Sequence, residues 1–367
     1  MTQTVLILGG TGRIGSSVGQ DLLTFTQAAI TLSGRAPQPQ LALARQHPDR
    51  VQTLVVNLDN QVALREAIVA YDLIVHCAGP FRYRDSRVLQ ACIDLGKPYL
   101  DVADNPPYVR EALSLRSQAE AAGVTAVVST GLFPGISNSM VRQGIEQLDQ
   151  ADEVKLSYAV AGSGGAGVTV MRTTFLELQH SFPAWVDGQW QDIMPYSQRE
   201  SVELPPPYGD CGVYWFSTVE AMTLPESFAL QSVTTKFGSL PNFYNHLTWL
   251  MAHVAPKTWL RQPQTVEFLA QASHQMTQIS DRFSGTGVAI RADILGQKAG
   301  RAAQYVSTLV HPDTAIAAGY GTGSVAQLIL TGQLHQPGVW PVEQAVTTAL
   351  FEQTMQQREV EINRSLS

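Results

Sequence analysis

Six residues near the start of the chain, Gly10-Thr11-Gly12-Arg13-Ile14-Gly15, constrain its fold more than any other stretch. An aliphatic and β-branched run at 4–8 precedes them, and residues 16–25 follow with apolar side chains near helical spacing. This pattern predicts a buried strand, a glycine-rich turn and a helix, which is the context that a dinucleotide fingerprint requires. The three glycines permit a tight turn, a close approach of the pyrophosphate and close packing of the helix on the strand. A glycine-rich turn without a ligand is the alternative.

The second strand is predicted at 28–32, and the residues directly after it indicate which dinucleotide binds. NAD sites place an acidic residue there to hold the ribose 2′-hydroxyl, whereas this chain reads Ser33-Gly34-Arg35. The Arg35 guanidinium can pair with a 2′-phosphate and stack on adenine. We therefore predict NADP(H) as the cofactor, with a solvated loop arginine as the alternative.

Composition excludes several classes of protein. The 367 residues suit two domains, and the net charge of −7 argues against a nucleic-acid partner. The three cysteines lack metal-site spacing, so we expect no metal and a reducing, cytoplasmic location. No apolar run reaches the roughly 18 residues that an integral membrane span needs. The chain starts directly with a strand, and we expect no signal peptide.

Strands and helices alternate from residue 50 to residue 129. Strands are expected at 50–59, 72–77, 98–102 and 125–129, with helices at 62–71, 86–95 and 107–122 between them. With the first two strands this gives six parallel strands of a doubly wound Rossmann sheet. Asp59 could bind the adenine edge or cap a helix. The loop Ala78-Gly79-Pro80-Phe81 is expected beside the cofactor.

An ordered series of motifs resembles the saccharopine dehydrogenase-like (saccharopine reductase-like) family of NADP-dependent oxidoreductases. The motifs are Gly9 to Gly15, Ser33 to Arg35, Ala78 to Phe81, Ala91 to Asp101, and Gly131-Leu132-Phe133-Pro134-Gly135. The resemblance implies a Rossmann domain, an inserted α+β substrate domain with a mixed sheet, and a helical C-terminal return to the first domain. It does not imply saccharopine as the substrate.

We accordingly expect an α/β protein in three segments: an NADP-binding domain at 1–134, an α+β substrate or dimerisation domain at 135–312, and a C-terminal segment at 313–367 that packs on the first domain. A second glycine run, 161–167, is interpreted as a loop or as a site for a substrate anion. The apolar helix 243–254 suits a core, a dimer interface, an apolar substrate pocket or a membrane surface. Paired strands are expected at 288–295 and 303–310, and helices at 315–330 and 342–357.

Few side chains are candidates for proton transfer near a nicotinamide. Asp101 and Asp104 follow the fifth strand, and Tyr83 follows the cofactor loop. Asp101 could instead cap a turn, and Tyr83 could be solvated. His76 is expected to be a core residue, and Cys77 to be inert.

The sequence favours an NADP(H)-dependent oxidoreductase that transfers hydride to or from a small or medium organic substrate, either an imine and amine or an enone and ketone. The alternative is a non-catalytic NADP(H)-binding regulatory or sensor protein. The sequence leaves the substrate and the reaction direction open, and a homodimer is a hypothesis only.

Overall fold

The computed structural model describes residues 2–37, 41–164, 168–260 and 262–367, and its chain divides into two compact units. Unit 1 contains Met1–Ser139 and Ala315–Arg358, and unit 2 contains Met140–Thr314 and Glu359–Ser367. This division differs from the expected one at the C-terminus. Only the part of 313–367 that ends at Arg358 belongs with the dinucleotide-binding unit, because the last residues pair with a strand of unit 2.

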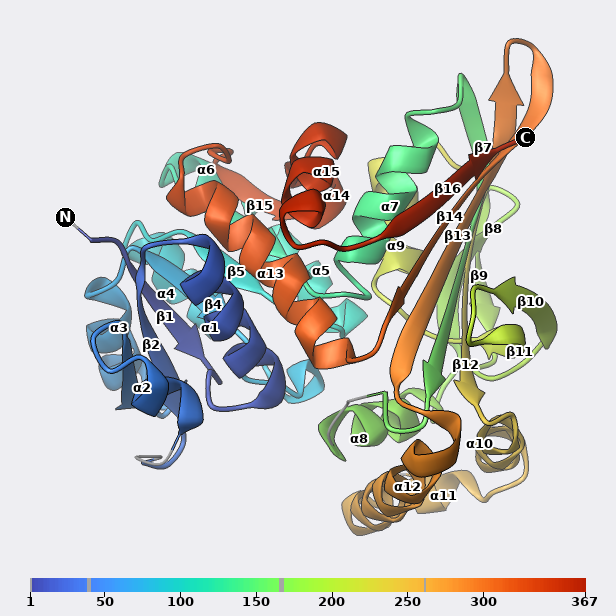
Figure 1. Cartoon of the computed structure of the whole chain (residues 1–367), viewed down its shortest axis with the longest axis horizontal. Coiled ribbons are helices and arrows are strands. Elements are labelled where there is room, and N and C mark those ends of the chain that lie inside the picture. The colour runs from blue at the N-terminus through green and yellow to red at the C-terminus, as the bar shows by residue number, and fades with distance from the viewer. Residues whose placement is uncertain (1, 38–40, 165–167, 261) are drawn as a thin grey trace. The chain divides into compact units, whose positions relative to one another are not determined.

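Unit 1 is built on a seven-stranded parallel sheet in the order β15-β6-β5-β4-β1-β2-β3, which confirms the predicted doubly wound α/β fold (Figure 1). The strands are β1 (Thr4–Leu8), β2 (Ala29–Gly34), β3 (Val51–Val55), β4 (Leu73–His76), β5 (Tyr99–Asp101), β6 (Thr125–Val128) and β15 (Gly338–Pro341). Val5 to Leu8 are fully buried, as expected for a central parallel strand that is covered on both faces.

Three features of unit 1 differ from the expectations. The seventh strand, β15, pairs with β6 from a distant part of the sequence. The helix expected at 107–122 is two helices, α5 (Pro106–Ser114) and α6 (Arg116–Ala121). The helix expected at 342–357 is also divided, into α14 (Val342–Ala345) and α15 (Thr348–Gln357), because Thr347 is extended and its side chain caps α15.

Four of the remaining helices of unit 1 lie close to their expected positions at 16–25, 62–71, 86–95 and 315–330. The remaining helices are α1 (Arg13–Phe25), α2 (Ala42–Gln46), α3 (Gln61–Val69), the 3₁₀ helix η1 (Phe81–Tyr83), α4 (Arg87–Asp94) and α13 (Thr314–Leu330), while α7 (Ile136–Ile145) spans the boundary between the units.

Unit 2 contains a seven-stranded mixed sheet in the order β10-β11-β12-β7-β13-β14-β16 and a separate hairpin of β8 and β9. The strands are β7 (Gln150–Ala161), β8 (Phe182–Val186), β9 (Gln189–Ile193), β10 (Glu200–Leu204), β11 (Gly209–Trp215), β12 (Ser232–Leu240), β13 (Gly287–Lys298), β14 (Arg301–His311) and β16 (Ile362–Leu366). β12 is parallel to β7, whereas β13 pairs antiparallel with both β7 and β14. The expected antiparallel pair at 288–295 and 303–310 is therefore confirmed, and β7, β13 and β14 run side by side in Figure 1.

The helices of unit 2 are α8 (Val168–Glu177), α9 (Glu220–Ser227), α10 (Phe243–His253), α11 (Lys257–Leu260) and α12 (Pro263–Ser284). Phe243, Trp249 and Leu250 of α10 are exposed, so this helix is not a fully buried core helix. Part of the second glycine run, 165–167, lies outside the described residues. In the described part of the chain, no helix combines the length and the apolar character that crossing a membrane requires.

Candidate cofactor-binding site

The turn between β1 and α1 is shaped by glycines that leave no room for a side chain. A Cβ on Gly9 would lie 2.7 Å from the Cα of Ala78, and one on Gly15 would lie 2.5 Å from the carbonyl oxygen of Gly9. Gly9 also has a φ of +74°, which favours glycine. The turn is closed by a hydrogen bond from the Gly12 N–H to the Gly9 carbonyl oxygen at 3.0 Å. The turn after β1 therefore lies directly against the loop that follows β4.

Gly12 is exposed and forms the N-cap of α1 without a side-chain cap. A Cβ there would have one close neighbour, the Gly9 carbonyl oxygen at 3.2 Å, so the surface above Gly12 is otherwise open. The helix start also carries no acidic residue in its first turn. A helix N-terminus with these properties suits a pyrophosphate, because its N–H groups and its partial positive charge face an open surface.

The end of β2 lies beside this turn. The Thr11 N–H donates to the Ser33 carbonyl oxygen at 3.4 Å, and a Cβ on Gly34 would lie 2.7 Å from Thr11 Oγ1. Arg35 follows, and it is exposed, with no hydrogen bond or ion pair to the described part of the chain. The geometry thus brings Arg35, Ser33 and Thr11 to the edge of the sheet where the glycine turn lies, and Arg35 is available for an anionic group.

The loop after β4 is held by its own side chains. Arg84 Nε donates to the Ala78 carbonyl oxygen at 2.9 Å. The Phe81 ring is buried, with ring centroids 5.0 Å from His76 and 4.9 Å from Tyr108. Phe81 therefore anchors the loop through its side chain, and the exposed Gly79 leaves backbone accessible there.

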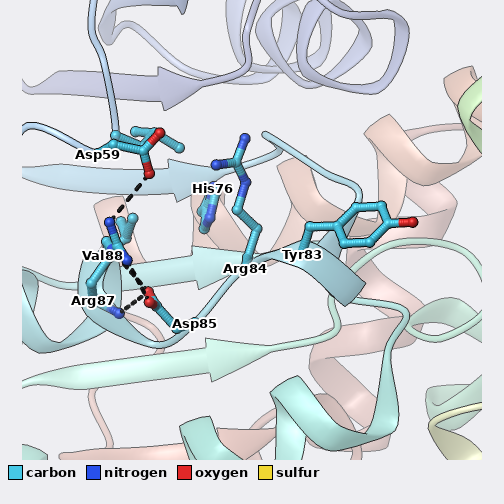
Figure 2. Close-up of a pocket in the computed structure, with 8 residues that line it drawn as sticks. Asp59, His76, Tyr83, Arg84, Asp85, Arg87 and Val88 are labelled. Atoms are coloured by element: carbon cyan, nitrogen blue, oxygen red, sulfur yellow. Dashed lines mark hydrogen bonds and ion pairs between the residues drawn. The ribbon is translucent and has the colours of Figure 1, made fainter. Parts of the chain in front are cut away.

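A small pocket of about 30 Å³ opens at the carboxyl ends of β3 and β4 (Figure 2). Its lining residues come from the segments that follow these strands and from the start of α4: Leu58, Asp59, His76, Tyr83, Arg84, Asp85, Arg87 and Val88. Arg87 donates to Asp85 at 2.7 Å and to Asp59 at 3.2 Å, as the dashed lines in Figure 2 show. The pocket thus joins Asp59 and Tyr83, two residues that the sequence singles out, with Arg84 and Arg87, which it does not.

His76 lines this pocket although its side chain is fully buried. Burial, assisted by the positive charge of Arg84, lowers the pKa of His76 to about 3, so the ring is neutral. Its Nδ1 accepts a hydrogen bond from the Ala78 N–H at 3.3 Å, which places the proton on Nε2. Nε2 has no hydrogen-bond partner among the residues that the structure describes. His76 has the expected core position, but its Nε2 lacks a hydrogen-bond partner among the described residues.

Asp101, a predicted catalytic residue, is fully buried at the end of β5. Its carboxylate accepts hydrogen bonds from the backbone N–H groups of Ala103 and Ser129 and from the Tyr99 hydroxyl, at 2.7 to 3.0 Å. Burial raises the pKa of Asp101 to about 6, against the lowering effect of these hydrogen bonds. This geometry matches the alternative interpretation of Asp101 as a residue that caps a turn.

The other two predicted catalytic residues are accessible. Tyr83 is 63% exposed at the end of η1, and in Figure 2 its ring points away from His76. Asp104 is exposed in the loop between β5 and α5. Both follow carboxyl ends of parallel strands, where ligands of open α/β sheets bind.

Residues 5–127 match the family model of the saccharopine dehydrogenase NADP binding domain. This segment is a saccharopine dehydrogenase NADP-binding domain. The match confirms the predicted family and NADP(H) as the cofactor, and the glycine turn and the open Arg35 fit that cofactor.

Two curated relatives extend this family relationship. A probable mitochondrial saccharopine dehydrogenase-like oxidoreductase of Arabidopsis thaliana is 30% identical over 141 residues, which cover 35% of this chain and 31% of that protein. The chain thus spans about a third of that relative's length. The carboxyaminopropylagmatine dehydrogenase of Synechocystis is 24% identical and covers 92% of each chain. One of these relatives is named an oxidoreductase and the other a dehydrogenase.

The fold of the whole chain also has a solved counterpart. The apo saccharopine dehydrogenase (L-Glu forming) of Saccharomyces cerevisiae aligns over 100% of both chains with a TM-score of 0.71 and 14% identity. This likeness confirms the fold class.

Proposed function

We propose that this protein transfers hydride between NADP(H) and a carbon–nitrogen bond, interconverting an imine and an amine of small or medium size. The observation that carries the proposal is the match of residues 5–127 to an NADP-binding domain whose glycine turn is open at Gly12. The full-length relative from Synechocystis is named a dehydrogenase of an amine, which supports a carbon–nitrogen bond over an enone or ketone.

The cofactor is held, in this proposal, by three segments of unit 1. The turn from Gly10 to Gly15 binds the pyrophosphate through backbone N–H groups, and Arg35 pairs with the 2′-phosphate. The loop from Ala78 to Phe81 offers backbone to the ribose and the nicotinamide, because Gly79 carries no side chain. When bound, NADPH supplies the hydride that reduces the imine carbon.

The proton that the imine nitrogen requires must come from a side chain or from water. Asp104 and Tyr83 are the candidates, because both are exposed beyond the carboxyl ends of parallel strands. Asp101 has a supporting role, because its carboxylate already accepts hydrogen bonds from two backbone N–H groups and the Tyr99 hydroxyl.

The test is consumption of NADPH by the purified protein with a panel of aldehydes, ketones, enones and keto acids, each with and without a primary amine. Consumption that requires the amine supports the proposal, and consumption with a ketone or an enone alone overturns the assignment to a carbon–nitrogen bond. The non-catalytic regulator is favoured instead if the protein binds NADPH tightly but turns over no carbonyl compound with an amine and oxidises no amine with NADP⁺. With an active pair, Asp104→Asn and Tyr83→Phe should lower kcat, and the exposed Glu120→Gln serves as the control.

Assembly and location complete the proposal. We infer a homodimer from the exposed apolar side chains of α10 to α12, which include Trp249, Trp259 and Phe268. Light scattering tests it, and a monomer at micromolar concentration would contradict it. The three free cysteines favour a reducing, cytoplasmic location, which fractionation of the source cells would test.

A further inference from the structure

The carboxylate of Asp101 joins two loops that follow neighbouring strands of the unit 1 sheet, β5 and β6. Its Oδ1 accepts hydrogen bonds from the Ala103 N–H at 3.0 Å, after β5, and from the Ser129 N–H at 2.7 Å, after β6. The Ser129 hydroxyl also donates to the Ala103 carbonyl oxygen at 2.8 Å. Ser129 has a φ of +60°, which a residue with a side chain rarely adopts, so these contacts maintain a backbone conformation that is unfavourable by itself.

The second carboxylate oxygen of Asp101 lies at the end of a chain of two buried tyrosines. The Tyr99 hydroxyl donates to Oδ2 at 3.0 Å, and the hydroxyl oxygens of Tyr99 and Tyr108 are 2.9 Å apart. Because a hydroxyl has one proton to donate, Tyr108 must donate to Tyr99 when Asp101 is ionised. Oδ1 already accepts two N–H groups, so an added proton would bind Oδ2 and force the Tyr99 hydroxyl to turn away. The hydrogen bonds of the two loops and the tyrosines therefore depend on the charge of Asp101.

This charge is costly in the folded protein. Burial raises the pKa of Asp101 to about 6, against its three hydrogen bonds, which lower it, whereas an aspartate in an unfolded chain has a pKa of about 3.9. The contribution of Asp101 to stability therefore falls as the pH rises from about 4 to about 6. A buried group that is charged at neutral pH at a cost to stability is typical of functional sites.

The surroundings of Asp101 hold one other charge that acts on it. The titratable groups that face it or the two tyrosines, apart from Asp104, stay uncharged between about pH 5 and about pH 8: His76 of β4, Cys77 in the loop after β4, Cys92 of α4, Tyr99 of β5 and Tyr108 of α5. Burial lowers the pKa of the histidine to about 3 and raises the pKa values of both cysteines and both tyrosines. The exposed Asp104 is the only charged group in the described chain that shifts the pKa of Asp101, and it raises it.

We propose that Asp101 is a positioning residue whose ionised carboxylate fixes the loop after β5, which carries Asp104, and that protonation of this carboxylate loosens the loop. The inference rests on the proposed function, because Asp104 is a candidate proton donor there. Ala103 directly precedes Asp104, so the hydrogen bond from its N–H to Oδ1 restrains the backbone next to Asp104. A hydrogen bond to an ionised acceptor is roughly twice as strong as one to a neutral acceptor, so loss of the charge weakens this restraint. The enzyme then loses activity in acid through a residue that is fully buried and acts only through the loop.

The first experiment is hydrogen exchange of the full chain, followed by mass spectrometry on the peptides that contain residues 102–105 and 129–131. It needs no substrate. Asp101→Asn supplies a neutral acceptor at the same place, so it mimics the protonated carboxyl at every pH. We expect the unaltered protein to protect these loops about tenfold more than Asp101→Asn at about pH 8, and equally at about pH 5. Comparison of the two proteins at each pH removes the intrinsic pH dependence of exchange.

Two further variants should shift the midpoint of this transition in opposite directions. Tyr99→Phe removes a hydrogen bond that lowers the pKa of Asp101, so the midpoint should move to higher pH. Asp104→Asn removes a charge that raises this pKa, so the midpoint should move to lower pH. Tyr108→Phe is the matched control, because it also removes a buried hydroxyl but leaves the hydrogen bond from Tyr99 to Asp101, and its midpoint should stay in place. Thermal denaturation checks that each variant is folded, and if Asp101→Asn does not fold, the opposite shifts still decide.

Turnover gives the second readout. With NADPH and the carbonyl–amine pair that the panel identifies, kcat of the unaltered protein should exceed that of Asp101→Asn about tenfold at about pH 8 and equal it at about pH 5. The KM for NADPH should be the same in both proteins. In Tyr99→Phe the fall of kcat in acid should move to higher pH together with the exchange transition.

The contrary outcomes are distinct. Equal loop protection in the unaltered protein and Asp101→Asn at about pH 8 would overturn the proposal. A kcat that is lowered by the same factor at every pH would overturn it as well, because it would indicate a structural role alone. If the protein turns over no pair, the proposed function fails, and hydrogen exchange then decides by itself whether Asp101 fixes the loop.

Discussion

Arg358 donates two hydrogen bonds to the carboxylate of Asp21, from Nε to Oδ1 at 2.8 Å and from Nη2 to Oδ2 at 2.7 Å, and both side chains are buried. The pair joins the first helix of the chain, α1, to the residue that follows α15, the last helix. Arg358 also lies over the Phe25 ring, with its guanidinium carbon 4.4 Å from the ring centroid. The ion pair therefore fixes the C-terminal part of unit 1 onto the helix that carries the glycine turn.

Loss of one partner of this pair should destabilise unit 1 strongly. Arg358→Leu leaves the Asp21 carboxylate buried without its counter-ion, and we expect the free energy of unfolding to fall by about 3–5 kcal/mol. The double variant Asp21→Asn with Arg358→Leu should recover part of the loss. Urea denaturation measures each value. The surface pair Arg65–Asp94, about 40% exposed, is the control, and Arg65→Leu should cost less than about 1 kcal/mol.

The buried His76 should make the protein sensitive to acid. Its pKa is about 3 in the folded protein, against 6.5 for an unperturbed histidine, so below pH 6.5 the unfolded chain binds a proton that the folded protein does not. The stability from His76 is present above pH 6.5 and is lost as the pH falls toward 3. From pH 7.5 to pH 5 the loss amounts to about 2 kcal/mol.

This acid sensitivity can be isolated with His76→Gln, which has no titrating group. We expect the difference in unfolding free energy between the unaltered protein and the variant to fall by about 2 kcal/mol over that pH range, measured by urea denaturation at each pH. A difference that stays constant with pH would mean that His76 titrates normally in the folded protein.

Two glycines of the same turn should respond differently to alanine. A methyl group on Gly15 would overlap the Gly9 carbonyl oxygen, so Gly15→Ala should lower the unfolding free energy by about 1–3 kcal/mol. Gly12 has room apart from one contact at 3.2 Å, so Gly12→Ala should fold normally. It should weaken NADPH binding at least tenfold if the pyrophosphate approaches Gly12, as the proposed function requires. Denaturation and calorimetry separate the two effects. Unchanged NADPH affinity in Gly12→Ala would refute the assignment of Gly12 to the cofactor.

Arg35 should determine the preference for the 2′-phosphate. Its replacement by aspartate puts a negative charge where the proposed function places the 2′-phosphate, and we expect NADPH affinity to fall about a hundredfold, equivalent to about 2.7 kcal/mol. NADH affinity should change little. Calorimetric titration with both cofactors gives the ratio. If both affinities fall alike, Arg35 contacts a part that the two cofactors share, such as adenine.

Local patterns were sufficient to predict most elements of unit 1 between residues 4 and 128. The run 4–8, the glycine turn and the alternation of strands and helices up to residue 128 all reflect short-range periodicity. The structure confirms them, except that the helix expected at 107–122 is divided into α5 and α6. Arg35 likewise lies at a fixed distance from the glycine turn, so its position beside that turn follows from chain order.

Features that depend on distant partners could not be predicted in this way. β15 is four residues long and ends in proline, and it is a strand because β6 offers it an open edge. β16 is polar and mostly exposed, so it carries no hydrophobic alternation. The pocket was missed for a related reason. Arg84 joins its lining because the loop after β4 brings Arg84 Nε to the Ala78 carbonyl oxygen, and a charged residue in a loop gives no such signal in the sequence.

Because β15 lies far behind β6 in the sequence, the sheet of unit 1 is completed late in the synthesis of the chain. The ribosome completes β6 about two hundred residues before β15, and all of 140–314 is made in between. Until then β6, with the sequence Thr-Ala-Val-Val, is the unpaired edge of a growing parallel sheet, which is the kind of surface that recruits strands from other chains. A nascent chain of this protein therefore has a defined interval in which a chaperone that shields that edge would improve its yield.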